Sequence, residues 1–285
     1  MGLPTLEILI STNDAGALGR IASAMPPREE GVSYLICWQK SEGREVPQAL
    51  AGRDDVRILR NRGTGLSQNR NFALDHASGD ILLIADDDLT YTEGAFSRIR
   101  EIFAASPGLD IATFRYECSD GSIEKIYPLS QVRLGRNLPK GYYVTSFEIA
   151  VRRLGRSGRL RFNPDFGLGA TVLGCGEEEI YLHSALRLGH EVEFFPLTIC
   201  VHDGPTTGSS PILKDSSLRG NGATIALLYP VSWLPRLPLK AWRLWRSRRG
   251  SFFRNLWQLT YGALYAIFKL ESPFKAESPW EERNS

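Results

Sequence analysis

Short apolar runs alternate with helical patterns through the first hundred residues of the chain. The runs are LEILIST (6–12), SYLICWQ (33–39), VRILRN (56–61) and ILLIAD (81–86). Each run has the length and composition of a buried strand. The helical patterns lie near 15–25, 67–77 and 94–105. Strands and helices in this order form right-handed crossovers, so the sequence predicts an α/β fold with a Rossmann-like, mostly parallel mixed sheet flanked by helices.

Polar residues stand at the carboxyl ends of these predicted strands. They are Thr12, Asp14, Gln39, Asp86, Asp87 and Asp88. Open α/β sheets bind their ligands in the crevice outside the carboxyl ends of the strands. The sequence therefore predicts a ligand site at this end of the sheet.

Three adjacent carboxylates follow the fourth run, and they repel one another unless a cation or strong donors hold them. Asp86 and Asp88 share one side of an extended chain, which suits Mg²⁺ or Mn²⁺ that is also bound by the phosphates of a substrate. Asp87 points to the other side, where it shapes the turn or contacts a nucleotide. The alternative is an exposed acidic turn in which Asp88 caps the next helix.

The stretch GTGLSQNRN is a glycine-bearing turn that opens a helix, with Ser67 as its N-cap and Gly79 as its stop. The N-terminus of a helix attracts anions. Arg70 lies near that end, and a guanidinium can hold a diphosphate through two parallel hydrogen bonds. With Asn71 beside it, Arg70 is a candidate phosphate ligand; the alternative is a surface arginine on an amphipathic helix.

Beyond residue 110 the pattern predicts two strands, a glycine-rich loop, a helix and a final strand. In that order they cover 110–116, 142–151, 161–176, 177–189 and 197–202. The final strand places Leu197 on one face and His202 on the other. An imidazole at a strand end beside Asp86 and Asp88 is a suitable third metal ligand.

Three glutamates, Glu177, Glu178 and Glu179, open the predicted helix after a flexible glycine turn. The helix dipole favours acids in a first turn, which explains some of them without any function. A carboxylate that faces a cleft could instead be the general base for an acceptor hydroxyl.

The charge of the chain is uneven, although its formal net charge is only +2. Residues 216–270 contain nine Lys and Arg side chains and no Asp or Glu. Just before this part, over 203–220, the composition turns to Gly, Ser and Pro. The sequence therefore predicts one domain over 1–215 and a basic, aromatic, helical C-terminal extension over 216–285.

Within the extension, residues 233–257 interleave arginine with tryptophan and phenylalanine. Lys240, Arg243 and Arg246 recur every three residues, with tryptophans beside them. This pattern suits an amphipathic helix at an anionic membrane surface. The alternatives are a helix packed on the catalytic domain with extended arginine side chains, or a surface for nucleic acid.

Four widely spaced cysteines without a CxxC pair favour reduced thiols in a cytosolic protein. No apolar run approaches the roughly 18 residues of a membrane span. The N-terminus also lacks the charged and apolar regions of a signal peptide. We expect a cytoplasmic protein, which would lie peripherally at the inner face of the cell membrane if its tail binds lipid.

The order of these motifs resembles the core of family 2 glycosyltransferases with the GT-A fold. The stretch GTGLSQNRNFALDHASGDILLIADDDL is similar to the family pattern G-x-S-x-x-RN, GD and DDD. GCGEEEIYL followed by VHDG resembles the later acceptor-base and histidine segments. The resemblance spans roughly residues 5–205, and its specificity comes from the order and spacing of the motifs.

The resemblance implies a GT-A domain that transfers a sugar with inversion from a nucleotide-diphosphate sugar, with a UDP-sugar as the expected donor. The acceptor would be a hydroxyl of a glycan or a lipid-linked molecule in surface polysaccharide synthesis. Lipid partners fit this activity better than nucleic acid, which we do not expect to bind.

The resemblance also implies a role for each candidate residue. Asp86 and Asp88 would hold Mn²⁺ or Mg²⁺ and the diphosphate, with His202 as a late metal contact. The expected donor contacts are Thr12, Asp14, Gln39, Arg70, Asn71, Asp86 and Asp87. Gln39 stands where the family commonly has an aspartate that reads the base. The catalytic base would be Glu178 or its neighbour Glu177.

Two other functions remain open from the sequence. ILLIADDDLT also fits the D-x-D-x-T pattern of haloacid dehalogenase-type phosphatases, with Asp86 as nucleophile and Asp88 as general acid. Three strands precede the motif, however, and the later lysine and acidic loop of that class are not evident. A non-catalytic module that binds nucleotide sugars could use the same fold.

Overall fold

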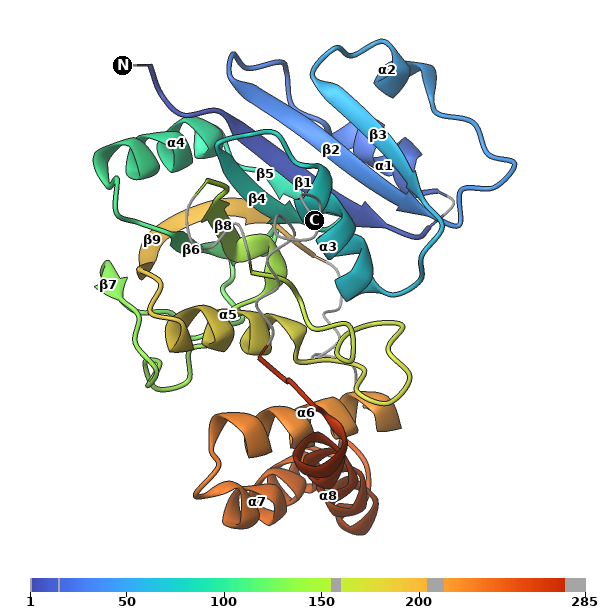
Figure 1. Cartoon of the computed structure of the whole chain (residues 1–285), viewed down its shortest axis with the longest axis vertical. Helices are drawn as coiled ribbons and strands as arrows, with labels where there is room; N and C mark the ends of the chain where they lie inside the picture. Colours follow the sequence, from blue (N-terminus) through green and yellow to red (C-terminus); the bar gives the residue numbers. More distant parts are fainter. Residues whose placement is uncertain (1, 15, 155–159, 204–212, 275–285) are drawn as a thin grey trace, which may run out of the picture.

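The computed structural model describes residues 2–14, 16–154, 160–203 and 213–274. Its strands form a twisted sheet with helices on both faces, and three further helices gather at the other end of the molecule (Figure 1). The predicted α/β class with a C-terminal helical part is therefore confirmed.

Within the described residues the sheet has nine strands in the order β3-β2-β1-β4-β8-β6-β9-β5, and β7 pairs with β9. Their bounds are β1 Leu6–Thr12, β2 Val32–Gln39, β3 Val56–Asn61, β4 Ile81–Ala85, β5 Thr90–Tyr91, β6 Ile111–Glu117, β7 Val132–Arg133, β8 Ile149–Arg152 and β9 Val192–Val201. β1 pairs in parallel with β2 and β4, and β2 pairs in parallel with β3. β8 runs antiparallel between β4 and β6, whereas β6 and β9 are parallel. The sheet is mixed, and its longest pairings are parallel, as the sequence predicts.

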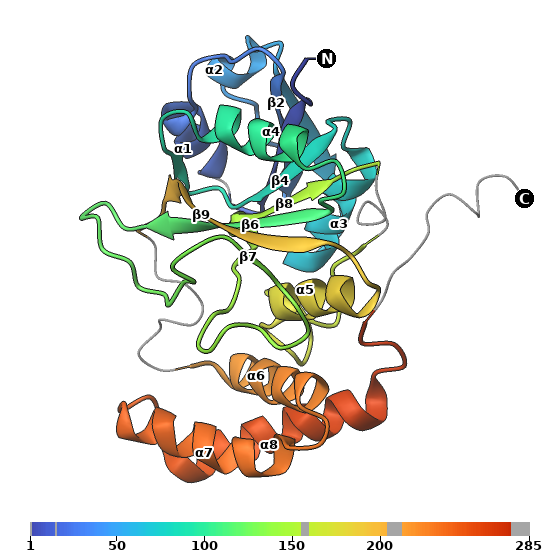
Figure 2. The same ribbon diagram turned by 90° about the vertical axis from the view of Figure 1, so that its left-hand side faces the viewer.

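The helices form two layers over the sheet and a separate C-terminal group. Their bounds are α1 Ala17–Ala24, α2 Gln48–Ala51, α3 Leu66–His76, α4 Ala95–Ala105, α5 Glu177–Arg187, α6 Asp215–Leu228, α7 Trp233–Arg246 and α8 Phe252–Lys269. α1 and α4 pack on one face, and α3 and α5 on the other (Figure 2). Along β1, Ile8 and Ile10 enter the first core and Leu9 enters the second, because successive side chains of a strand point to opposite faces.

The structure differs from the sequence predictions in α3, in the strand predicted over 142–151 and in the strand predicted over 197–202, which is longer and begins at Val192. α3 begins at Leu66 with Gly65 as its N-cap, at a φ of 96°, and Ser67 lies in the first turn. The prediction of Ser67 as N-cap is wrong because its hydroxyl instead donates to the Phe166 carbonyl over 2.7 Å. The predicted strand over 142–151 is also too long: a 3₁₀ turn occupies Ser146–Glu148, and only β8 is extended.

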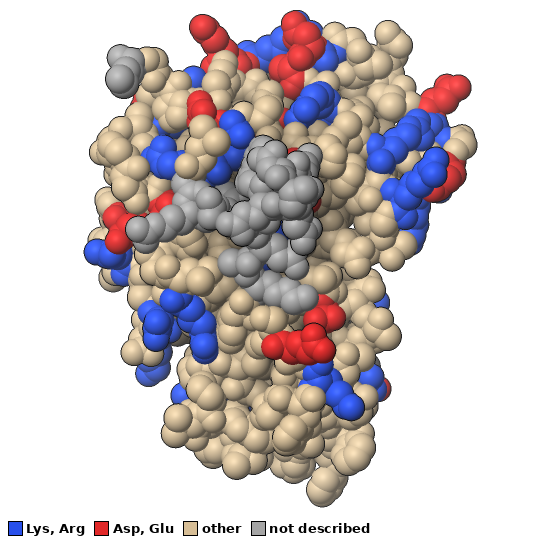
Figure 3. Space-filling view, in the orientation of Figure 1, with Lys and Arg blue, Asp and Glu red and all other residues tan. Residues whose placement is uncertain are grey.

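The C-terminal extension is a helical unit that packs on the rest of the molecule. α6 begins at Asp215, beside the predicted boundary, part of which lies outside the described residues. α6 and α8 approach very closely, since a Cβ on Gly222 would lie 1.9 Å from the Leu259 carbonyl oxygen. Ala223 and Ala266 of these helices join an apolar cluster with Phe166, Leu173 and Ile180. On the face seen in Figure 3, the end of the molecule formed by these helices carries few charged side chains.

Two sequence expectations concern the thiols and membrane spans. All four cysteines are free, and Cys37 and Cys200 are buried. In the described part of the chain, no helix combines the length and the hydropathy that crossing a bilayer requires.

Candidate active site

The parallel pairing of β1 with β4 brings the polar residues after both strands together. The Thr12 hydroxyl donates a hydrogen bond to the Asp87 carboxylate. Arg20 of α1 lies 2.7 Å from Asp14 and 3.6 Å from Asp87. Burial raises the pKa of Asp87 despite the hydrogen bond from Thr12. Asp87 thus faces β1 and α1, while Asp86 and Asp88 are held by other partners.

Arg70 is the centre of the site, and its side chain is only 1% exposed. One guanidinium nitrogen donates to Asp86 over 3.0 Å and to the Ser146 hydroxyl over 2.6 Å. The other lies 3.3 Å from Glu177 and 3.5 Å from Glu178. Burial alone would lower the pKa of Arg70, but the three carboxylates outweigh it and raise that pKa. One cation therefore links the carboxylate that follows β4 to the start of α5, although Arg70 and Glu178 are 108 residues apart along the chain.

The acids around Arg70 carry more negative charge than one guanidinium can balance. Burial is the main cause that raises the pKa of Glu177 to about 8, followed by repulsion from Glu178. Burial likewise raises the pKa of Glu179 to about 7. Glu177 Oε2 is buried without a hydrogen-bond partner, which suits a protonated carboxyl. Near neutral pH a proton on Glu177 thus reduces the repulsion among these carboxylates.

Glu177 and Glu178 differ in their access to solvent. The Glu177 side chain is 6% exposed and lies against the 163–169 loop, where a Cβ on Gly167 would be 2.9 Å from its carboxyl carbon. The Glu178 side chain is 19% exposed and contacts Arg70 at the limit of a hydrogen bond. Of the two, Glu178 is the carboxylate that a ligand can reach.

Asp88 pairs with His202 from the end of β9. His202 Nε2 lies 3.4 Å from Asp88 Oδ2. The hydrogen bond between them raises the pKa of His202 and lowers that of Asp88. The imidazole is 7% exposed and packs against Phe147 at a ring distance of 5.1 Å. Asp88 does not cap a helix, since α4 begins at Ala95 with Gly94 as its N-cap.

The predicted metal ligands have suitable chemistry but do not form a complete cage. In the part of the chain that the structure describes, no three His, Cys, Asp or Glu side chains stand together as a metal site. Asp86 and Asp88 offer partly exposed carboxylates, and His202 Nδ1 is buried without a partner. Carboxylate oxygens and an imidazole suit Mn²⁺ or Mg²⁺ when a ligand supplies further oxygens. The residues therefore fit an ion that enters with a phosphate ligand.

Two amides proposed for donor contacts are engaged within the protein. Gln39 is buried at the end of β2 and donates to the Gly65 carbonyl over 3.3 Å. Asn71 exchanges two hydrogen bonds of 2.8 Å with the backbone of Phe162. Gln39 borders the turn before α3, whereas Asn71 fastens α3 to the segment that leads into the glycine-rich loop.

The sequence predictions do not include a buried ion pair that supports the turn in contact with Arg70. Glu148 forms an ion pair with Lys125 and accepts hydrogen bonds from the Thr145 backbone and hydroxyl at 2.6 and 2.7 Å. These contacts hold the 3₁₀ turn whose Ser146 accepts from Arg70. The pattern Thr145-x-x-Glu148 is a capping-box signature, so the sequence contains a signal that predicts this turn. No sequence pattern predicts the ion pair between Glu148 and Lys125.

The resemblance to a known family is confirmed over part of the chain. The family model described as Glycosyl transferase family 2 matches residues 42–160, which include Arg70 and the three aspartates. No curated protein matches the chain. The family match supports a glycosyltransferase.

Solved structures show the same fold. TarS 1-349 of S. aureus superposes with a TM-score of 0.54 at 12% identity, over 94% of this chain and 73% of that chain. Its complex with UDP-GlcNAc gives a TM-score of 0.55 at 13% identity, over 94% and 77%. Its complex with UDP gives 0.54 at 11% identity, over 84% and 70%. Likeness at this identity establishes the fold, and the predicted GT-A architecture is confirmed.

Proposed function

We propose that this protein is an inverting glycosyltransferase that moves a sugar from a nucleotide-diphosphate sugar, a UDP-sugar above all, to an acceptor hydroxyl. The observation that carries the proposal is the double contact of Arg70 with Asp86 and with Glu178. Through these contacts the guanidinium, a group suited to phosphates, lies beside a carboxylate suited to proton transfer. The family match and the fold shared with a protein solved in complex with UDP-GlcNAc support the same activity.

The donor would lie across the ends of β1, β2 and β4. Thr12, Asp14 and Asp87 would contact the nucleotide, and Gln39 would border its base. Arg70 is buried and paired with Asp86 and Glu178, so it would serve the diphosphate by holding these carboxylates in place. Asn71 would act indirectly, because both ends of its amide are occupied by Phe162.

Mn²⁺ or Mg²⁺ would be held by Asp86 and Asp88, with His202 beside them. When bound, such an ion offsets the negative charge of the departing diphosphate. His202 fixes the orientation of Asp88 through the hydrogen bond that they share. Arg70 does the same for Asp86 on the other side.

Glu178 would act as the general base. Its carboxylate takes the proton of the acceptor hydroxyl while that oxygen attacks the anomeric carbon from the side opposite the diphosphate. The bond from the anomeric carbon to the diphosphate oxygen breaks as the new glycosidic bond forms, so the configuration inverts. Glu177 is buried and its raised pKa keeps it protonated near neutral pH, so it would support Arg70 rather than accept this proton.

A screen of nucleotide sugars with Mn²⁺ tests the function through release of the nucleoside diphosphate. We expect release from at least one UDP-sugar by the wild type and a loss of at least about 100-fold in Glu178→Gln. The matched control is Glu177→Gln, which keeps the shape of the neighbouring side chain and should retain most of the rate. Equal rates in wild type and Glu178→Gln would overturn the role of Glu178. Cleavage of phosphate esters without use of any nucleotide sugar would favour the phosphatase instead.

We further propose that the acceptor is a glycan or lipid-linked molecule of surface polysaccharide synthesis, and that the protein works at an anionic membrane surface. The support is the outer side of α7 and α8. Exposed apolar side chains there are Leu234, Trp242, Trp245, Phe253, Trp257, Leu264 and Phe268. Their spacing on α8 puts Phe253, Trp257 and Leu264 on one stripe.

Basic side chains flank this apolar surface. α7 buries Leu237, Ala241 and Leu244 against the extension, and it leaves Arg243 and Arg246 exposed. α7 therefore packs on α6 and α8, and it presents aromatic and basic groups outward. Aromatic rings with neighbouring arginines match the interface of an anionic bilayer.

Sedimentation with vesicles tests this surface. We expect the wild type to bind vesicles of phosphatidylglycerol and phosphatidylcholine more strongly than vesicles of phosphatidylcholine alone. Trp257→Glu should weaken binding at least about tenfold, because it places a carboxylate within the apolar stripe. Leu129→Glu changes another exposed apolar side chain, outside the three C-terminal helices, and is the control. Unchanged binding in Trp257→Glu would refute the assignment.

A further inference from the structure

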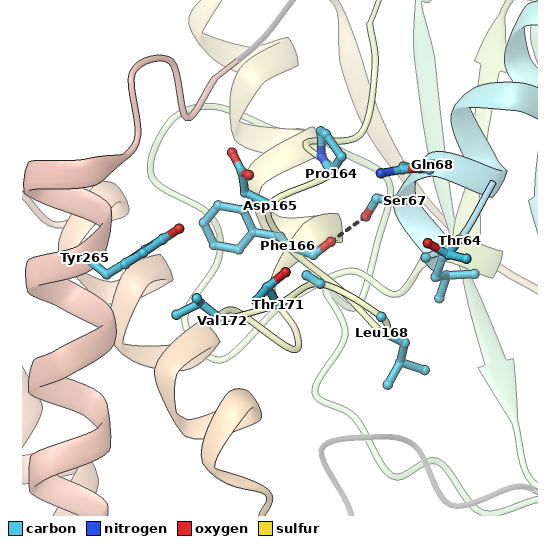
Figure 4. Close-up of a pocket in the computed structure, with 14 residues that line it drawn as sticks. Thr64, Ser67, Gln68, Pro164, Asp165, Phe166, Leu168, Thr171, Val172 and Tyr265 are labelled. Carbon is cyan, nitrogen blue, oxygen red and sulfur yellow. Dashed lines mark hydrogen bonds between the residues drawn. The ribbon is translucent and has the colours of Figure 1, made fainter.

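A cavity of about 300 Å³ lies between helix α8 and the turn that begins α3. Its other wall is the loop over 164–172 (Figure 4). The side chains that define its chemistry are Thr64, Gln68, Asp165, Phe166, Thr171 and Tyr265. Tyr265 comes from the C-terminal extension, so the cavity exists only where the extension meets the catalytic part.

The walls of this cavity are held by hydrogen bonds from three parts of the chain. The Leu66 amide donates to the Leu168 carbonyl over 2.8 Å, and Ser67 donates to Phe166. Asn163 donates to the Pro273 carbonyl over 3.0 Å, which fastens the loop to the segment after α8. A Cβ on Gly169 would lie 2.8 Å from the Gly65 Cα, so the two backbones touch. The cavity is therefore a built feature with fixed walls.

The lining suits a neutral, hydroxyl-rich ligand. No Lys or Arg is present among the described residues that line the cavity, so a phosphate there would have no cationic side chain to pair with. The Asp165 carboxylate and the Gln68 amide can accept hydrogen bonds from hydroxyl groups, and the two threonines can exchange them. Tyr265 adds an aromatic face with a polar edge, against which the apolar face of a sugar ring can pack. The volume is at the lower end of small-molecule sites.

The cavity lies one loop away from the acid cluster. Glu177 contacts the loop at Gly167, where an added Cβ would be 3.0 Å from its Oε1 and 3.0 Å from the Ser67 hydroxyl. Ser67 lines the cavity and lies one helical turn before Arg70. The cavity and the acid cluster thus share two neighbouring elements, the loop at Gly167 and the first turn of α3.

We propose that this cavity binds a neutral sugar unit of the acceptor glycan other than the unit that carries the reacting hydroxyl. The inference rests on the proposed glycosyltransferase function and adds to it that the acceptor is an extended saccharide. Binding energy from such a remote unit would orient the reacting end of the acceptor toward Glu178. The extension would then contribute to acceptor choice through Tyr265.

Saturation-transfer NMR with cellobiose, maltose and N,N′-diacetylchitobiose tests the proposal on the full-length protein. We expect transfer to at least one of these disaccharides in the wild type and at least about tenfold weaker binding in Tyr265→Ala. The matched control is Tyr261→Ala, one turn earlier on α8, whose ring stacks on Tyr265 at 6.5 Å but does not line the cavity. Thr171→Trp, which fills the cavity from an exposed position, should act like Tyr265→Ala.

Binding of UDP with Mn²⁺ on the same samples separates this inference from the proposed function. UDP should bind all variants equally and should not displace the disaccharide. Absence of transfer from the three disaccharides, or equal transfer in wild type and Tyr265→Ala, would overturn the sugar subsite while UDP binding persists. Displacement of the disaccharide by UDP would assign the cavity to the donor and overturn it as well. Failure of the wild type to bind UDP would instead count against the proposed function.

Discussion

Replacement of Glu177 by glutamine should change how the stability of the protein depends on pH. Glutamine has the shape of a protonated glutamate and cannot ionise. In the folded protein, burial and Glu178 raise the pKa of Glu177 from 4.5 to about 8. Between these two values the folded state holds a proton that the unfolded state has released. The free energy of unfolding of the wild type therefore falls as pH rises through this window.

The size of the effect follows from the shift. At about 1.4 kcal/mol per pKa unit, the full change is at most about 5 kcal/mol, and about 2–3 kcal/mol of it falls between pH 6 and pH 9. Glu177→Gln lacks this loss, so its stability should exceed that of the wild type by a margin that widens with pH.

Urea denaturation at pH 6, 7.5 and 9 measures the margin. The control is Glu101→Gln, which alters an exposed glutamate on α4 and should run parallel to the wild type. If the free energies of unfolding of Glu177→Gln and the wild type change in parallel with pH, Glu177 is not protonated in the folded protein and the charge balance around Arg70 is refuted. A margin between the two proteins that narrows as pH rises would refute them as well.

Two further predictions concern packing and a buried ion pair. Gly222→Ala should lower the free energy of unfolding by at least about 2 kcal/mol, because its Cβ would meet the Leu259 carbonyl oxygen at 1.9 Å. Thermal unfolding measures this loss. An unchanged midpoint would show that α6 and α8 can separate freely. Glu148→Gln should lower the free energy of unfolding, measured by urea denaturation, by about 3 kcal/mol, since it leaves the buried Lys125 without its ion-pair partner. A loss below about 1 kcal/mol would mean that Lys125 becomes neutral without cost.

The first half of the fold could be predicted because its signals are local. The strands β1 to β4 are continuous apolar runs between helical patterns, and their observed bounds differ from the predicted ones by at most one residue. The N-cap prediction for Ser67 was wrong because a serine before a helical pattern normally caps the helix. Here the Ser67 hydroxyl donates a hydrogen bond to the carbonyl of Phe166, which is distant in the sequence. The strand predicted over 142–151 was cut short because Thr145 and Glu148 close a turn.

The candidate site was predicted in kind but not in geometry. Asp86, Asp88 and His202 stand at strand ends, and a parallel sheet brings such ends together. The meeting of Arg70 with Glu177 and Glu178 joins residues more than 100 positions apart, and no local pattern encodes it. The different burial of the two glutamates, which separates a reachable carboxylate from a protonated one, depends on the loop packed against them.

Calorimetric titration of UDP with Mn²⁺ into the purified protein tests the central claim most directly, because it needs neither the donor sugar nor the acceptor. We expect one UDP to bind per chain, with affinity that falls at least about tenfold without the metal or in Asp88→Asn. Absence of binding by UDP and by other nucleoside diphosphates, with and without Mn²⁺, would contradict the claim that the ends of β1, β4 and β9 form a nucleotide-sugar site.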